Sequence, residues 1–238
     1  MKAKSALAAL LLLPVFCGLA MGEEEGAILE KDGVVVKCFD GDTFQMMDRR
    51  IIRLAGIDAP ETPRGTNQAQ YHARRSRKIL EDLLRGQKIT LSIPGTKRRD
   101  NWGRYLAEAK RAPNEPSINE QLVALGAAFF YPHEDLGPDF QERLSRLQTE
   151  AINERRGLWA YLLSHPVAEK RYVGNRDTLR FFPEDCAAAS QIKPRNRVNF
   201  GNLMDAFLAG YAPSRVCPFW PDAVGDKKDP SPSEGATR

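Results

Sequence analysis

The chain has 238 residues, of which 42% are hydrophobic and 28% charged, and its formal net charge is +4. This composition is ordinary for a globular protein and excludes a wholly disordered chain. The length allows one well-cored domain and a smaller second one. A net charge this small identifies no partner, so only the distribution of charge along the chain is informative.

Residues 1–22 have the pattern of a secretory signal peptide: two lysines precede an apolar run from Ala6 to Phe16, and small residues follow. The run is shorter than the ~20 residues that a membrane span requires, which disfavours an uncleaved anchor. A lipid attached to Cys17 is a further alternative, which the bulky residue before it disfavours. We expect an exported protein, periplasmic or extracellular, in a compartment that permits disulfides.

Five short strand-like runs and three helical patterns follow. The predicted strands are 34–38, 43–47, 51–55, 88–93 and 105–109, and the predicted helices are 66–85, 117–126 and 138–157. This order predicts an α+β domain over residues 30–162, a five-stranded β-barrel of the OB type with packed helices. Alternation in the first strand places Val34, Val36 and Cys38 on one face, so we expect Cys38 to be a buried, reduced thiol.

Three segments, 40–43, 53–61 and 100–104, concentrate charged residues beside glycine and proline. Each alone has a structural explanation, since Asp-Gly is a common turn and a lone arginine can lie on an edge strand or a solvated turn. Together they offer a metal site. Asp42 and Asp58 are hard oxygen donors of the kind that Ca²⁺ binds, and no His/Cys cluster with zinc spacing lies nearby.

The same segments contain groups suited to phosphate chemistry. Glu61 follows Asp58 by three residues and could orient or deprotonate a water. Arg53 and Arg104 are planar two-pronged donors that match phosphate oxygens. Hydrolysis of a phosphodiester requires an activated water, a Lewis acid on the phosphoryl oxygen and fixed positive charge where negative charge develops. The three segments together therefore indicate phosphodiester hydrolysis.

From residue 34 to 159 the chain resembles the staphylococcal nuclease (thermonuclease) family, with the three segments in the same order and at compatible spacing. The resemblance implies an OB barrel, a single Ca²⁺ ion and attack by water that leaves 3′-phosphate ends on DNA or RNA. It implies these roles: metal ligands Asp42, Asp58 and the carbonyl of Ala59; general base or water-positioning residue Glu61; phosphate-binding arginines Arg53 and Arg104; and aromatic residues beside the substrate base Trp102 and Tyr131. Ala59 departs from a threonine of some members, which matters little for a backbone contact.

Basic residues are consistent with a polyanionic substrate. Residues 85–111 contain eight Lys or Arg against two acidic residues. Beside the predicted turn at 100–104, Lys97, Arg98 and Arg99 are interpreted as phosphate-steering, substrate-binding residues. The basic run 74–78 is interpreted instead as a solvated helix face.

Residues 168–220 are predicted to form a small Cys-containing module, and 221–238 a disordered tail rich in Pro, Ser and Gly. The module resembles, more weakly, the zinc module of the Ada DNA-repair protein, with Phe182 and Ser214 standing where ligands are common. Two thiols cannot complete a closed zinc site. We expect a disulfide between Cys186 and Cys217, with zinc as the alternative.

The prediction is an exported, monomeric, calcium-dependent endonuclease that acts on DNA, RNA or both, with no stable membrane partner after signal cleavage. One alternative is a non-catalytic nucleic-acid-binding OB module. It is disfavoured because the acidic and arginine positions are all retained. Another is a secreted structural protein whose carboxylates bind Ca²⁺ for stability, which leaves the two arginines unexplained.

Overall fold

The computed structural model describes residues 27–63, 69–217, 219 and 220. The predicted signal peptide and the predicted tail lie outside these residues. No helix in the described part of the chain is long and apolar enough to cross a membrane.

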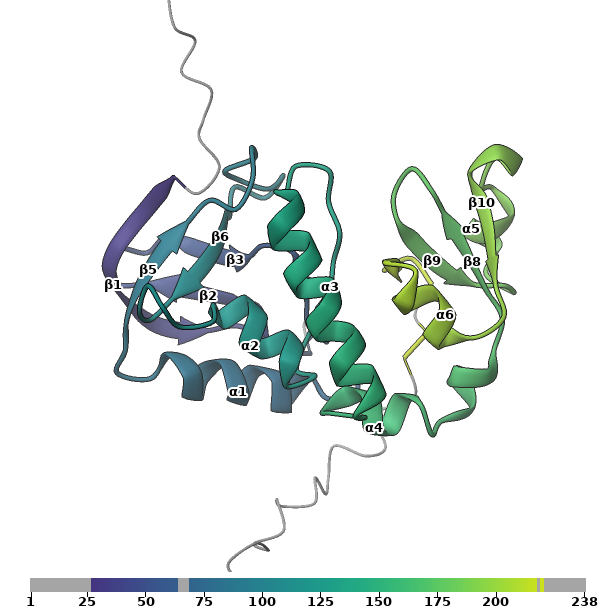
Figure 1. The fold of residues 1–238 in the computed structure, drawn as a ribbon, viewed down its shortest axis with the longest axis horizontal. Helices are drawn as coiled ribbons and strands as arrows, with labels where there is room; N and C mark the ends of the chain where they lie inside the picture. Colours follow the sequence, from purple (N-terminus) through teal and green to yellow (C-terminus); the bar gives the residue numbers. More distant parts are fainter. Residues whose placement is uncertain (1–26, 64–68, 218, 221–238) are drawn as a thin grey trace, which may run out of the picture.

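Five strands close into a barrel, which confirms the predicted α+β barrel fold (Figure 1). The order around the barrel is β1 (Ile28–Cys38), β2 (Thr43–Met46), β3 (Ile51–Leu54), β6 (Tyr105–Lys110) and β5 (Lys88–Ser92), and β5 pairs back onto β1. The β3–β6 pair is parallel and the other four pairs are antiparallel. A separate two-stranded ribbon joins β4 (Ile57–Asp58) to β7 (Phe129–Phe130).

Helices α1 (Ala73–Leu84), α2 (Ile118–Ala124) and α3 (Pro138–Asn153) accompany the barrel. The capping box predicted from Ser117 and Glu120 begins α2, and Pro138 occupies the first turn of α3. Residue 66, where the sequence predicts this helix to begin, lies outside the described residues, and the described residues 69–72 are not helical. His72 has a left-handed backbone (φ 69°) directly before the helix, and the Gln70 amide pairs back to the Glu61 carbonyl.

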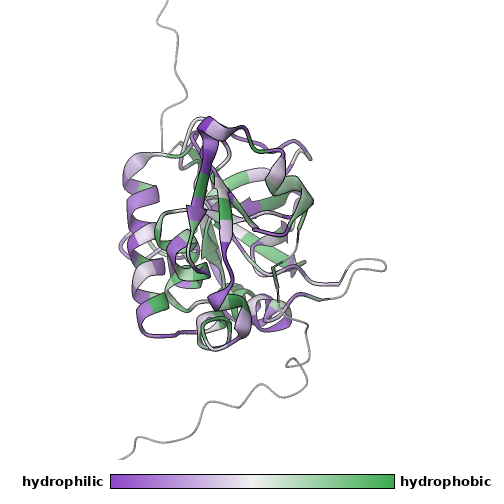
Figure 2. Ribbon diagram, turned by 90° about the vertical axis from the view of Figure 1, so that its right-hand side faces the viewer, coloured by the Kyte–Doolittle hydropathy of each residue, from purple (hydrophilic) through white to green (hydrophobic). Residues whose placement is uncertain are grey.

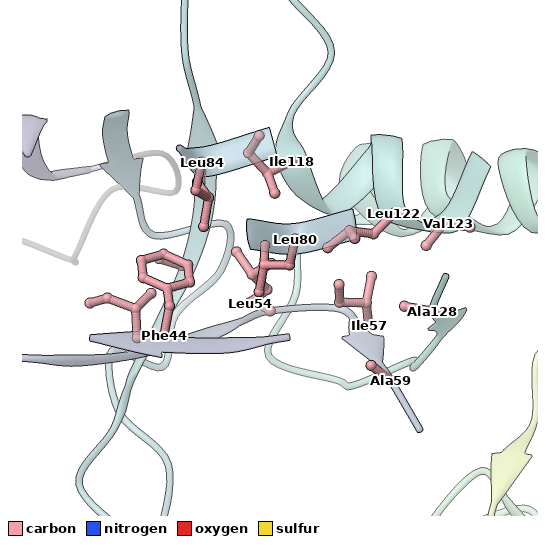
Figure 3. Close-up of a cluster of buried hydrophobic side chains, with 14 of the residues drawn as sticks. Phe44, Leu54, Ile57, Ala59, Leu80, Leu84, Ile118, Leu122, Val123 and Ala128 are labelled. Atoms are coloured by element: carbon pink, nitrogen blue, oxygen red, sulfur yellow. The ribbon is translucent and has the colours of Figure 1, made fainter. Parts of the chain in front are cut away.

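The barrel core lies between the strands and helices α1 and α2 (Figure 3). Phe44 and Leu54 come from the strands, Leu80 and Leu84 from α1, and Leu122 from α2; all are at most 3% exposed. Figure 2 shows hydrophobic residues alternating with hydrophilic ones along the strands, which is the period-two pattern of a sheet with one buried face.

The inward face of β1 differs from the prediction. Val34 and Val36 are 39% and 56% exposed, while Cys38 is buried as expected. The pairing register with β2 shifts between Val35 and Lys37, and this bulge reverses which side chains point inward. Cys38 is a free thiol, and burial raises its pKa to about 12. It is therefore protonated and unreactive near neutral pH.

The C-terminal part contains a four-stranded sheet in the order β10-β8-β9-β11, with helices α5 (Ala187–Ser190) and α6 (Leu203–Leu208). Its strands are β8 (Tyr172–Asn175), β9 (Arg180–Pro183), β10 (Arg197–Phe200) and β11 (Ala212–Pro213). Cys186 and Cys217 are joined in a disulfide with Cα atoms 6.2 Å apart. This pairing uses both thiols that the zinc alternative would need, and among the described residues no group of three or more His, Cys, Asp or Glu side chains is arranged to hold a metal ion.

The C-terminal part shares its hydrophobic core with the barrel domain through α3 and α4 (Leu158–Leu162). Trp159 of α4 packs edge-on against Phe207 of α6, with ring centroids 4.8 Å apart. Buried Gln148 of α3 accepts a hydrogen bond from the Phe130 amide (2.8 Å) and donates one to the Phe207 carbonyl (3.2 Å). The two parts are thus joined by continuous packing and by a buried polar side chain.

We predict that Gln148→Ala lowers the free energy of unfolding by about 2–5 kcal/mol. The change leaves a buried amide and a buried carbonyl without partners, at about 1–3 kcal/mol for each. Glu142→Ala, at an exposed position of the same helix, is the control and should change stability by less than about 0.5 kcal/mol. Chemical denaturation of both variants is the measurement. If Gln148→Ala and Glu142→Ala unfold with the same free energy, Gln148 does not stabilise the contact between the barrel domain and the C-terminal part.

Candidate active site

The centre of the site is the guanidinium of Arg53, a residue of β3 that is only 7% exposed. Its Nη1 lies 2.5 Å from Asp42 Oδ2, and its Nη2 lies 2.6 Å from Asp58 Oδ1. A single buried cation therefore brings together the two carboxylates that the sequence predicted as metal ligands. Burial alone would lower the pKa of Arg53, but the carboxylates of Asp42 and Asp58 raise it.

Asp42 lies in the tight turn that leads into β2. Its amide donates to Asp40 Oδ1 (3.3 Å), and its carboxylate accepts hydrogen bonds from the Ala59 amide (2.7 Å) and the Thr43 hydroxyl (2.8 Å). Gly41 is required between the two aspartates because a Cβ there would lie 2.7 Å from the Cβ atoms of Ala59 and of Ser76 in α1. The Asp-Gly-Asp sequence thus packs closely against the segment that carries Ala59.

Asp58 is positioned by the turn between β3 and β4. Gly56 has φ +72°, and a side chain there would meet Leu144 and Phe140 of α3 within 3 Å. The turn carries Asp58 into the β4–β7 ribbon, where it pairs with Phe129. The turn therefore allows Asp58 to accept a hydrogen bond from Arg53, which lies only five positions earlier in the sequence.

Glu61 lies at the edge of this group, with its side chain 33% exposed. Its amide donates to Gln70 Oε1 at 2.8 Å, which fixes the backbone. Burial raises the pKa of the carboxyl group, and the charges of Asp40 and Asp58 also raise it, while Arg215 lowers it. A half-buried carboxylate with a raised pKa is suited to accepting a proton from a water molecule.

Arg104 directly precedes β6 and reaches toward Thr43. Its Nε lies 2.7 Å from Asp100 Oδ2, and its Nη1 lies 3.5 Å from the Thr43 hydroxyl, which itself donates to Asp42. Its guanidinium carbon is 5.3 Å from the ring centroid of Trp102, which is 76% exposed. Arg104 and Trp102 therefore offer a cation and an accessible aromatic face next to the carboxylates.

Three carboxylates, those of Asp40, Asp42 and Asp58, interact at the centre. Burial raises the pKa of Asp42, and the neighbouring Asp40 and Asp58 carboxylates raise it further against the opposing effect of Arg53. Asp40, which the sequence analysis did not assign to the site, is itself 3% exposed. Buried carboxylates held this close together fit a hard divalent cation, because carboxylate oxygens are its preferred ligands. Asp42 and Asp58 are the side chains that would hold it.

The other predicted substrate-binding residues lie around this centre in different ways. Lys97 and Tyr131 line the same cavity of about 310 Å³ as Arg53, Arg104 and Trp102. Exposed Arg99 is held over the ring of Tyr105 at 3.7 Å, and Arg98 is exposed on the same segment. The structure does not place these last two in the cavity.

The basic run of α1 lines a second, open cavity of about 850 Å³ that also includes Thr43 and Arg104. Arg77 and Lys78 are about half exposed and form ion pairs with Glu81 and Asp82 one turn later. They are thus both a solvated helix face and part of a cleft that meets the site at Arg104.

Two arginines that the sequence analysis missed also line the 310 Å³ cavity: Arg180 of β9 and Arg215, which follows β11. Arg215 Nη2 lies 2.6 Å from Asp58 Oδ1 and 3.3 Å from Glu61 Oε1. Asp58 and Arg215 are 157 positions apart, so no local pattern indicates this contact.

Comparisons with known proteins identify relatives of this chain. Residues 51–161 match the model of the family described as Staphylococcal nuclease homologue. An "uncharacterized endonuclease" of Escherichia coli is 36% identical over 131 residues, covering 54% of this chain and 76% of the relative. A "thermonuclease" of Staphylococcus intermedius is 25% identical over 130 residues, covering 53% of this chain and 74% of the relative.

A "probable endonuclease" of Schizophyllum commune is 29% identical over 129 residues, covering 50% of this chain and 43% of the relative. The comparisons give no support to an Ada-type zinc module, and the family match ends before the C-terminal sheet. The matched segment contains Arg53, Asp58, Glu61 and Arg104, which the structure gathers with Asp42 around one buried centre. The chain belongs to the staphylococcal nuclease homologue family.

Proposed function

We propose that this protein is a nuclease that hydrolyses phosphodiester bonds of DNA, RNA or both with the help of Ca²⁺. The observation that carries the proposal is the sharing of buried Arg53 by Asp42 and Asp58, with Glu61 and Arg104 next to them. Relatives whose names include "endonuclease" and "thermonuclease" support the same reaction class.

Each residue has a role in this reaction. Asp42 and Asp58, with the carbonyl of Ala59, would hold Ca²⁺, which when bound supplies a Lewis acid for a phosphoryl oxygen. Glu61 orients the attacking water and accepts its proton. Arg53 and Arg104 donate to the phosphate oxygens as negative charge develops on them.

The bond changes follow from these roles. The water oxygen bonds to phosphorus, and the bond from phosphorus to the 5′ oxygen breaks. The leaving oxygen takes a proton to become a 5′-hydroxyl, and the phosphate remains on the 3′ side.

A polynucleotide suits the surroundings of the centre. Exposed Trp102 offers a ring on which a base could stack, and the cavity along α1 presents Arg77 and Lys78 next to Arg104. Stacking on aromatic rings and a basic groove are the two components of single-strand binding. A non-catalytic OB module would account for the basic groove, but it would leave the buried carboxylates unexplained.

We further propose that the protein is exported. The pattern of residues 1–22 and the Cys186–Cys217 disulfide support this, because disulfides persist in oxidising compartments. The mass of the protein recovered from outside the cytoplasm should correspond to loss of a segment of about this length. Recovery of the full-length chain from the cytoplasm alone would contradict it.

A divalent cation should be needed for activity and should stabilise the fold. We expect chelator to abolish cleavage and Ca²⁺, but not Zn²⁺, to restore it, with products that carry 3′-phosphates. Binding at a hundred times Kd adds about 2.7 kcal/mol, which corresponds to a rise in Tm of roughly 5–10 °C. The double variant Asp42→Asn/Asp58→Asn should lose this rise, and Glu142→Gln should keep it. Full activity in excess chelator would contradict the proposal.

Arg53→Ala, Glu61→Ala and Arg104→Ala should each lower kcat by about 100-fold or more, the scale for removing one preorganised group that acts in the transition state. Arg146→Ala removes an exposed arginine of α3 that pairs with Glu150, and it is the control for loss of positive charge. Steady-state kinetics on single-stranded DNA and RNA provide the measurement. Near wild-type turnover in all three site variants would show that the site is wrongly assigned.

A further inference from the structure

Two arginines from the C-terminal part of the chain face the cavity beside the proposed active site. Arg180 and Arg215 line it together with Arg53 and Arg104 of the barrel domain. In Figure 1 the β9 side of the C-terminal sheet faces the barrel domain across α3. Both arginines lie outside residues 51–161, so the family match does not account for them.

We propose that Arg180 and Arg215 bind a phosphate group of the polynucleotide substrate, next to the phosphate that is cleaved. This proposal rests on the proposed nuclease function. The C-terminal part is then one wall of the substrate-binding site.

Arg180 has the properties of an incompletely neutralised cation. It is half-buried, its Nη1 donates to the Pro213 carbonyl at 3.2 Å, and no carboxylate of the described residues lies within ion-pair distance. Burial lowers its pKa, and the charge of Arg215 lowers it further, against the opposing effects of Tyr131 and Asp58. An anion in the cavity would oppose this lowering of the pKa, because a charged guanidinium away from water requires a partner.

Arg180 also limits where a base can bind. Its guanidinium carbon lies 3.6 Å from the centroid of the Tyr131 ring, so one face of this tyrosine is covered by a cation. Exposed Trp102 is therefore the accessible aromatic ring of the cavity, and the Tyr131 side presents positive charge instead. A nucleotide strand carries both groups, so it could place a base against Trp102 and a phosphate against Arg180.

Arg215 forms ion pairs with two carboxylates of the site but keeps part of its guanidinium exposed. Its Nη2 contacts Asp58 and Glu61, and about half of its side chain is exposed, so other donors of the guanidinium can face the cavity that Arg215 lines. A cation on Asp58 would compete for the oxygen that Arg215 contacts. Arg215 would then be free to pair with phosphate while staying close to the reacting bond.

The competing interpretation is that Arg215 only fastens the C-terminal part onto the barrel through Asp58. In that case its loss would lower stability and leave substrate binding unchanged. The two interpretations therefore separate when affinity and stability are measured on the same variants.

The test uses Arg180→Gln, Arg215→Gln and the conservative Arg215→Lys in the full chain. Arg171→Gln is the matched control, because Arg171 is an exposed arginine at the other end of the β8–β9 hairpin, about 13 Å along the strands from Arg180. The probe is a single-stranded hexanucleotide with phosphorothioate linkages, which keeps the charge of the strand and resists cleavage. Its Kd is measured by fluorescence anisotropy in Ca²⁺ over a range of salt concentrations, and Tm is recorded for each protein.

We expect Kd to rise about tenfold in each Gln variant, the scale for loss of one charge-assisted hydrogen bond. The slope of log K against log salt should fall by about 0.7 for each lost phosphate contact, with Arg215→Lys intermediate and Arg171→Gln unchanged. If Arg180→Gln and Arg215→Gln fold and keep the affinity and salt slope of the wild-type protein, the phosphate-binding inference is wrong, whatever their Tm. Cleavage of DNA or RNA by the wild-type protein would still support the nuclease assignment in that case. A wild-type protein that neither binds nor cleaves would overturn both.

Discussion

A guanidinium buried between two carboxylates sets the geometry of the site. Arg53 holds Asp42 and Asp58 within hydrogen-bond distance of the same planar group, although Asp42 lies in the turn before β2 and Asp58 lies in β4. Removing charges from water is costly, and buried ion pairs are often no more stabilising than apolar residues of the same volume. Stability therefore does not explain this group. A buried cluster of carboxylates and arginine does have an explanation in a site that receives a cation and a phosphate.

The surrounding fold is arranged so that this group stays in place. Arg53 lies within β3, between β2 and β6, and so cannot move without disturbing two strand pairs. The absence of a side chain at Gly41 lets the Asp42 turn approach Ala59, and the positive φ of Gly56 returns the chain from β3 to Asp58. The site is thus built on strands and tight turns, which hold catalytic groups more precisely than long loops do.

Much of the barrel and its centre could be predicted from local sequence, because the strands are short runs separated by turns and the site residues lie in three short segments. Val34 and Val36 were wrongly placed inward, since a bulge in β1 depends on pairing with β2 and leaves no mark on the alternation. The start of α1 was placed too early, because helical periodicity continued across the left-handed His72. Arg215 could not be found at all. Its contact with Asp58 exists only once the C-terminal sheet has packed against α3 and α4.

That packing fixes the position of the C-terminal part relative to the active-site cavity. Phe181 of β9 is fully buried against Phe207 of α6, whose neighbour across the core is Trp159 of α4. The β9 strand therefore has a fixed position relative to the barrel. Arg180 is the first residue of β9, so its backbone is fixed in the same way. Arg215 is fixed from both sides, by β11 pairing with β9 before it and by the disulfide at Cys217 after it. Because the backbone that carries these arginines is already fixed, little conformational entropy is lost when they bind a ligand. The positive charge at the cavity wall is therefore preorganised, which favours binding.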